Sequence, residues 1–247
     1  QIIKYLNWKV PYYAHIPLIH GTDGTKLSKR NGATSLFDYH DLGYTSETMF
    51  SYLLQLGWSA KNEEDYSRHR ATKLFTLEKV NKSPAKFDLK KLNNINAKNL
   101  NSMKVNDVYK LVIDRFKLSL NNKEQKRFKS LLPELLKRVQ IYTDLEFEFD
   151  WIFQEDFFCK DKNYQLQLKK NDLMLKEIGS LLKETEWNIE NIKKCLNKYI
   201  LENSLTFKDI GPILRISLTG KTNSPDLVSI IYELGCTITV NRLNYKY

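Results

Sequence analysis

The sequence has few of the residues that build disulfide frameworks and metal sites. Among its 247 residues there are three cysteines and four histidines. The cysteines lie far apart and form no C-x-x-C pair, which argues against a disulfide framework and a zinc site and favours buried thiols in a reducing cytosol. The histidines do not take metal-ligand spacing either. These residues are Cys159, Cys195, Cys236, His15, His20, His40 and His69. We therefore expect no metal site in this chain.

Long apolar runs are also absent. No run approaches the roughly 20 residues that a helix needs to cross a bilayer, and no signal peptide is visible, so we expect a cytoplasmic protein without a membrane partner. Internal repeats and low-complexity tracts are missing too. The 42% hydrophobic and 12% aromatic content argues against disorder. A chain of this length can bury a real core in one to three domains.

Acidic residues are fewer than basic ones. The chain has 39 Lys and Arg against 29 Asp and Glu, a formal net charge of +10. This balance suits a polyanionic partner and would speed its capture electrostatically. The alternative is an ordinary soluble protein from a lysine-rich proteome, and charge alone does not decide between the two.

The most informative segment is a basic loop. A strand-like run, Tyr12–Ile19, leads into Gly21-Thr22-Asp23-Gly24-Thr25, and Lys26-Leu27-Ser28-Lys29-Arg30 closes the loop. The two glycines let the backbone bend, and lysines on flexible stems can follow a polyphosphate as its charge redistributes. The pattern K-x-S-K by itself is weak, because solvated basic loops are common in lysine-rich chains. The neighbouring residues decide its meaning.

The stretch His15–Ala33 resembles the KMSKS segment of bacterial glutamyl-tRNA synthetases, which are class I aminoacyl-tRNA synthetases. The resemblance continues in the family's order and covers nearly the whole chain, with a diffuse match from about residue 99 to 205. Leu27 stands where the signature has methionine, which is a volume-conserving swap. Arg30 replaces the final serine, and Asn31 stands where many relatives carry histidine. The further matching segments are Gly43-Tyr44, Tyr52–Ser59, Lys82–Asp88, Pro212–Gly220 and Glu233–Gly235.

This resemblance implies a mainly α fold. We expect the end of a Rossmann catalytic domain with the KMSKS-like loop at residues 1–34 and a helical stem-contact domain at 35–98. An all-helical anticodon-binding region should follow in two subdomains, 99–160 and 161–247, unlike the β-barrels of glutaminyl-tRNA synthetases. The HIGH-motif nucleotide-binding domain of the family does not occur in this sequence. We therefore expect the C-terminal part of a synthetase, inactive in adenylation on its own.

Residue patterns in the chain agree with a helical fold. Apolar residues recur at helical spacing from Val105 almost to the end. Ser46–Gly57 should form one helix, with Gly57 placed to end it. The best delimited helix has Ser224 as its cap, Pro225 at its first position and Gly235 at its end.

The resemblance also implies a reaction. In the resembled enzyme glutamate attacks the α-phosphate of ATP, with Mg²⁺ expected, and the acyl group then passes to the 3′ end of tRNA(Glu); whether tRNA(Gln) is also charged stays open. Cations aimed at the pyrophosphate leaving group stabilise the transition state. By position in the motif, Lys29 contacts the ATP phosphates, Lys26 is the supporting catalytic cation, and Ser28 offers a hydroxyl or backbone N–H. We expect a monomer.

A second basic cluster indicates tRNA binding. Lys123, Lys126, Arg127 and Lys129 are followed by Lys137-Arg138. By resemblance, Arg138 falls where family members present an arginine to the third anticodon base. A planar guanidinium both stacks on a base and donates paired hydrogen bonds. We expect Lys126, Arg127 and Lys137 to support tRNA binding beside Arg138. The alternative is a solvated helix face.

Two other functions stay open at this point. One is a stand-alone tRNA-binding module derived from a synthetase and lacking catalysis. The other is a helical scaffold with no nucleic-acid role. Retained loop lysines disfavour the first, because a pure binder has little use for an ATP-phosphate loop.

Overall fold

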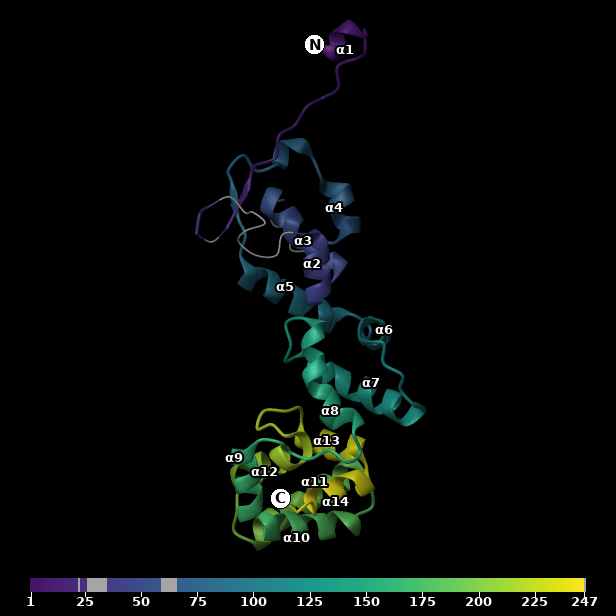
Figure 1. Cartoon of the computed structure of the whole chain (residues 1–247), viewed down its shortest axis with the longest axis vertical. Helices are drawn as coiled ribbons and strands as arrows, with labels where there is room; N and C mark the ends of the chain where they lie inside the picture. The colour runs from purple at the N-terminus through teal and green to yellow at the C-terminus, as the bar shows by residue number, and fades with distance from the viewer. Residues whose placement is uncertain (22, 26–34, 59–65, 247) are drawn as a thin grey trace. The chain divides into compact units, whose positions relative to one another are not determined.

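The chain forms two compact units, residues 1–100 and 101–247, which we call unit 1 and unit 2. The structure is a computed structural model and describes residues 1–21, 23–25, 35–58 and 66–246. Figure 1 labels the elements along the chain. Helices predominate in both units, so the prediction of a mainly α fold is confirmed.

Unit 1 is built from short helices around one pair of strands. The strands β1 and β2 pair in parallel, with Ile19 opposite Ala85 and His20 opposite Lys86. Of the strand expected over Tyr12–Ile19, only Ile19 lies in β1, because the preceding residues have no ladder partner among the described residues. The elements are α1 (Ile2–Tyr5), β1 (Ile19–His20), α2 (Leu36–Leu42), α3 (Ser46–Gly57), α4 (Arg68–Leu74), η2 (Leu77–Lys79), β2 (Ala85–Lys86) and α5 (Leu89–Ser102).

Aromatic rings and local caps hold unit 1 together. The ring of Phe87 packs against Tyr39 and Tyr52, with centroids 5.7 and 5.2 Å away. Ser35 and Asp38 form a capping box at the start of α2, and Gly43 ends that helix with a left-handed φ of 99°. The prediction of a helix over Ser46–Gly57 is confirmed by α3.

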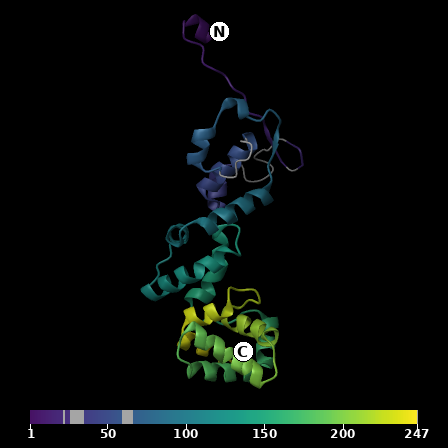
Figure 2. The same ribbon diagram turned by 180° about the vertical axis from the view of Figure 1, so that it is seen from behind.

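The described residues of unit 2 form helices joined by irregular segments and contain no strand. Figures 1 and 2 both show α14 lying along α10. The elements are α6 (Val105–Phe116), α7 (Asn122–Leu136), η3 (Tyr142–Glu148), α8 (Phe149–Phe153), α9 (Lys162–Lys170), α10 (Asp172–Lys183), α11 (Ile189–Glu202), α12 (Phe207–Thr219), α13 (Leu227–Leu234) and α14 (Cys236–Leu243).

An aromatic cluster joins α6, α7 and α8 in the core of unit 2. The ring of Phe128 lies 6.0 Å from Phe149 and 5.5 Å from Phe153, and Phe116 packs edge-on against Phe149 at 5.1 Å. Such edge-to-face pairs are the arrangement that aromatic quadrupoles favour. The start of α7 is fixed by a capping box between Asn121 and Glu124.

The predicted helix between residues 224 and 235 is correct at its end but not at its cap. Gly235 ends α13, as expected, and a further helix, α14, follows it. The cap is Asp226, whose carboxylate accepts a hydrogen bond from the Ser229 amide at 2.9 Å. Ser224 lies earlier in the loop, where it accepts a hydrogen bond from Arg215.

Candidate nucleic-acid interface

The KMSKS-like residues Lys26, Leu27, Ser28, Lys29 and Arg30 lie outside the described part of the chain. The turn that leads into them is described. Asp23 accepts hydrogen bonds from the amide and the hydroxyl of Thr25, at 3.0 and 2.9 Å, and the Gly21 amide donates to the Thr25 carbonyl at 2.8 Å. These bonds from Thr25 lower the pKa of Asp23. The turn therefore closes on itself directly after β1.

The exposed face of α7 carries cations. Lys123 and Lys126 are exposed. Lys129 is half-buried, with its ammonium 4.4 Å from the centroid of the Tyr109 ring. A cation held over a ring face is attracted by the ring's quadrupole. Lys123 and Lys126 are therefore the members of the first basic group that point into solvent.

Arg127 does not belong to this exposed face, contrary to the sequence-based expectation. It is only 8% exposed. Its Nη1 donates to the Ile152 carbonyl at 2.7 Å, its Nε to Glu233 at 3.0 Å and its Nη2 to Leu234 at 3.5 Å. Burial lowers the pKa of this guanidinium, an effect that nearby carboxylates oppose. The helical period turns Arg127 inward while Lys126 points outward, so Arg127 is not placed to contact tRNA.

Lys137 and Arg138 are exposed directly after the last turn of α7. Lys137 pairs with the carboxylate of Glu134. Arg138 donates through Nη1 to the side-chain oxygen of Asn223, which lies in the loop between α12 and α13. We call residues 220–226 the recognition loop. The structure thus brings the predicted anticodon arginine against a segment 85 residues away in the chain.

The recognition loop is held from within by Arg215 on α12. Its Nη1 donates to the Ser224 carbonyl at 2.9 Å, to the Ser224 hydroxyl at 2.7 Å and to the Pro225 carbonyl. Burial lowers the pKa of Arg215, the charge of Asp226 opposes this, and the charge of Arg138 adds to it. The guanidinium groups of Arg215 and Arg138 therefore lie near one another at this loop.

Lys221 attaches the other end of the recognition loop to η3. Its ammonium donates to the Phe147 carbonyl at 2.8 Å and to the Glu148 carboxylate at 2.6 Å. No site role had been predicted for Arg215, Lys221 or Asn223. The segment Pro212–Gly220 was part of the resemblance, but its pattern carries no sign that the following loop meets the end of α7.

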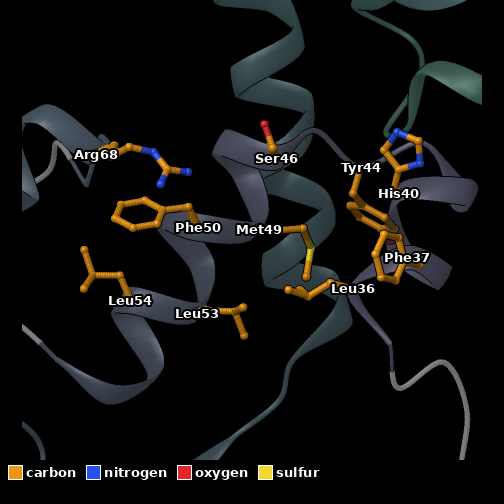
Figure 3. A pocket seen from close by; sticks show the side chains of 10 residues that line it. All are labelled: Leu36, Phe37, His40, Tyr44, Ser46, Met49, Phe50, Leu53, Leu54 and Arg68. Carbon is orange, nitrogen blue, oxygen red and sulfur yellow. The ribbon is translucent and has the colours of Figure 1, made fainter.

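Unit 1 holds a pocket of different chemistry (Figure 3). It has a volume of about 650 Å³ and an apolar lining, with the Arg68 guanidinium 4.6 Å from the Phe50 ring centroid at one end. Arg68 also forms an ion pair with Glu47 at 3.7 Å. A lining of aliphatic and aromatic side chains does not suit phosphate groups. The lining residues are Leu36, Phe37, His40, Tyr44, Ser46, Met49, Phe50, Leu53, Leu54 and Arg68.

The described residues contain neither a metal-ligand cluster nor a membrane-spanning helix. Within them, no group of three or more His, Cys, Asp or Glu side chains could hold a metal ion. No helix in the same ranges is long and apolar enough to cross a bilayer.

Comparison with known proteins assigns both units. Residues 1–94 match the family described as tRNA synthetases class I (E and Q), catalytic domain, and residues 107–246 match the anticodon binding domain family. The chain is 34% identical over 254 residues to glutamate–tRNA ligase 2 of Wolbachia sp. subsp. Brugia malayi, which covers 98% of this chain and 54% of the relative. The chain belongs to the class I glutamyl-tRNA synthetase family.

Other members of the synthetase family show the same coverage. Glutamate–tRNA ligase of Pelagibacter ubique is 31% identical over 250 residues, which are 100% of this chain and 54% of that relative. A crystal structure of a glutamate tRNA ligase from Elizabethkingia meningosepticum has the same fold, with a TM-score of 0.81 at 23% identity over 98% of this chain and 52% of that one. The chain spans about half the length of the curated relatives it matches and corresponds to their C-terminal portion.

Proposed function

We propose that this chain supplies the KMSKS-like loop and the tRNA-binding surface of a glutamate–tRNA ligase, and that it does not form the adenylate alone. The tRNA-binding part rests on the hydrogen bond from Arg138 to Asn223, inside the region that matches the anticodon-binding family. The partner is tRNA(Glu), with tRNA(Gln) as a second substrate to be tested. We place the protein in the cytoplasm as a monomer.

The proposed chemistry has two steps. A glutamate carboxylate oxygen attacks the α-phosphorus of ATP, which forms glutamyl adenylate and releases pyrophosphate. A ribose hydroxyl at the tRNA 3′ end then attacks the acyl carbon and releases AMP. Lys29 binds the departing phosphates, Lys26 supports it, and Ser28 donates a hydrogen bond. Mg²⁺ would enter with ATP as part of the substrate, because this ion is usually bound through substrate phosphates together with one or two carboxylates.

The catalytic half of the proposal is tested by pyrophosphate exchange. The chain is joined to the N-terminal half that the curated relatives carry, and Lys29→Ala is compared with Lys4→Ala, which changes an exposed lysine of α1. Lys29→Ala should lower exchange by on the order of 10²-fold, because it removes a cation from the developing charge. An unchanged rate would remove Lys29 from the mechanism.

The tRNA-binding half is tested by the salt dependence of affinity. Binding of the present chain to a tRNA(Glu) transcript should weaken steeply as salt rises. Lys126→Ala should reduce the slope of log affinity against log salt by about 1, because one phosphate contact is lost. Lys193→Ala, an exposed lysine on α11, is the matched control and should leave the slope unchanged. Salt-independent binding would contradict the phosphate contacts.

A catalytically silent tRNA-binding module is the second candidate. It is favoured by the anticodon-binding match, which covers more than half of the chain. The two assays separate the candidates, because this module retains salt-dependent tRNA binding while the extended protein shows no pyrophosphate exchange.

A further inference from the structure

Two arginines of unit 2 are buried where three helices end. Arg127 lies on α7 and is 8% exposed, and Arg242 lies on α14 and is 2% exposed. A buried guanidinium is tolerated only when its charge and its donors are compensated. The acceptors that compensate these two groups are main-chain carbonyls of other helices.

Arg242 joins α8 to α12. Its Nη1 donates to the Leu218 carbonyl at 2.6 Å, and its Nη2 donates to the carbonyls of Trp151 and Gln154 at 2.8 and 2.7 Å. The guanidinium also lies 5.0 Å from the centroid of the Phe157 ring.

Arg127 joins α7 to α8 and α13 through its bonds to Ile152, Glu233 and Leu234. All the acceptors of the two arginines lie at the C-terminal ends of α8, α12 and α13. The last carbonyls of a helix have no partner within it and lie at its negative end, so a buried cation with several N–H groups satisfies them well.

These contacts hold the two helices that flank the recognition loop. Arg242 fixes the end of α12, just before the loop, and Arg127 fixes the far end of α13, the helix that follows the loop. Both arginines donate to carbonyls of α8. Arg127 lies on α7, and Arg138 follows the end of that helix. We call Arg127 and Arg242 the arginine clamp.

We propose that the arginine clamp consists of positioning residues for anticodon recognition, which fix Arg138 against the recognition loop before tRNA arrives. This proposal rests on the proposed tRNA-binding function. A preformed guanidinium loses less conformational freedom on binding, so the clamp raises selectivity without touching RNA.

Arg127→Lys tests the clamp. Lysine keeps the charge but lacks the planar fork that reaches three carbonyls. Ser130→Ala is the milder variant on the same seam, since the Ser130 hydroxyl donates to the Glu233 carboxylate at 2.6 Å. Leu182→Ala, in the core of α10, is the control that destabilises unit 2 while both clamp arginines stay in place.

The first readout needs no RNA. Amide hydrogen exchange of residues 220–226, measured well below the melting temperature, should be roughly fivefold faster in Arg127→Lys than in the wild type, within the range by which non-contacting residues modulate coupling. Ser130→Ala should shift it in the same direction by less. In Leu182→Ala, the exchange of residues 220–226 should speed up by no more than the loss of global stability accounts for.

The second readout is the ratio of affinities for two anticodon stem-loop RNAs that differ only in the third anticodon base. Arg127→Lys should lower this ratio by roughly fivefold, with an unchanged salt slope because no phosphate contact is lost. If the ratio and the loop exchange of Arg127→Lys both match those of Leu182→Ala, the clamp is overturned as a positioning device. A wild-type chain that does not distinguish the two RNAs contradicts the proposed function instead, and loop exchange then decides the clamp by itself.

Discussion

The two units bury their apolar residues to different degrees. In unit 1, Trp8, Tyr12, Ile16 and Phe37 are 63%, 100%, 78% and 79% exposed. Unit 2 closes its own core, and apart from the stacked rings of Phe158 and Tyr245 its exposed large hydrophobic residues are spread over many helices, as is usual on a protein surface. Unit 2 therefore has the more closed apolar core of the two units.

The units also satisfy buried polar groups differently. Unit 1 uses neutral side chains: the Tyr52 hydroxyl accepts from the Asp88 amide at 2.6 Å and donates to the Asp88 carbonyl at 3.0 Å. Unit 2 adds the charged arginine clamp to neutral groups such as the Ser217 hydroxyl, which donates to the Arg242 carbonyl at 3.0 Å. Removing one of unit 1's neutral partners should therefore cost less than opening unit 2's core.

The largest expected effect is on the core of unit 2. Phe128→Ala should lower the free energy of unfolding by about 3–5 kcal/mol, because it empties a fully buried aromatic site. Phe147→Ala, at a side chain that is 71% exposed, should change it by less than about 0.5 kcal/mol. Urea denaturation measures both. Equal effects of the two variants would contradict a closed core in unit 2.

Tyr52→Phe tests unit 1. It should destabilise that unit by about 1–3 kcal/mol, since the amide and carbonyl of Asp88 lose their partner. Tyr5→Phe, at an 87% exposed ring, is the control. Denaturation followed by residue-resolved hydrogen exchange separates the units. A loss of stability confined to unit 2 would contradict the role of Tyr52 in unit 1.

Alanine substitutions at one glycine in each unit separate the cost of backbone strain from the cost of a crowded Cβ. Gly24 and Gly220 have φ values of 81° and 71°, so alanine is strained at both by about 1–2 kcal/mol. Among the described residues, a Cβ on Gly24 meets no atom within 4 Å, whereas one on Gly220 meets the Phe157 ring at 3.0 Å. Gly220→Ala should therefore shift thermal unfolding more than Gly24→Ala. Equal shifts would show that Phe157 moves aside freely, and the reverse order would contradict crowding at Gly220.

The effect that is smallest at neutral pH is a pH dependence in unit 2. Burial, together with the hydrogen bond from Tyr199 to Glu177, raises the pKa of Tyr199 from 10 to about 12. The neutral phenol therefore stabilises the fold below pH 10, and this contribution is lost as pH rises from 10 to 12. Tyr199→Phe should flatten the stability profile over that window and nowhere below it. An unchanged slope would contradict the shift.

The sequence predicted the class of fold well and the site only in part. Helical spacing and caps are local features, so α3 and the end of α13 followed from their own residues. The contact between Arg138 and Asn223 is a tertiary feature that no local pattern contains. Arg127 was misplaced because a run of basic residues does not reveal which of them turns inward. The assignments of Lys26, Ser28 and Lys29, and the division of unit 2 at residue 160, stay predictions.

The most direct test compares wild type with Arg138→Lys on two tRNA(Glu) transcripts that differ in the third anticodon base. The wild type should prefer the natural base, and Arg138→Lys should lose that preference by roughly tenfold while its salt slope stays the same, because the charge remains and the planar fork is lost. An equal preference in both proteins would contradict recognition of the anticodon through Arg138.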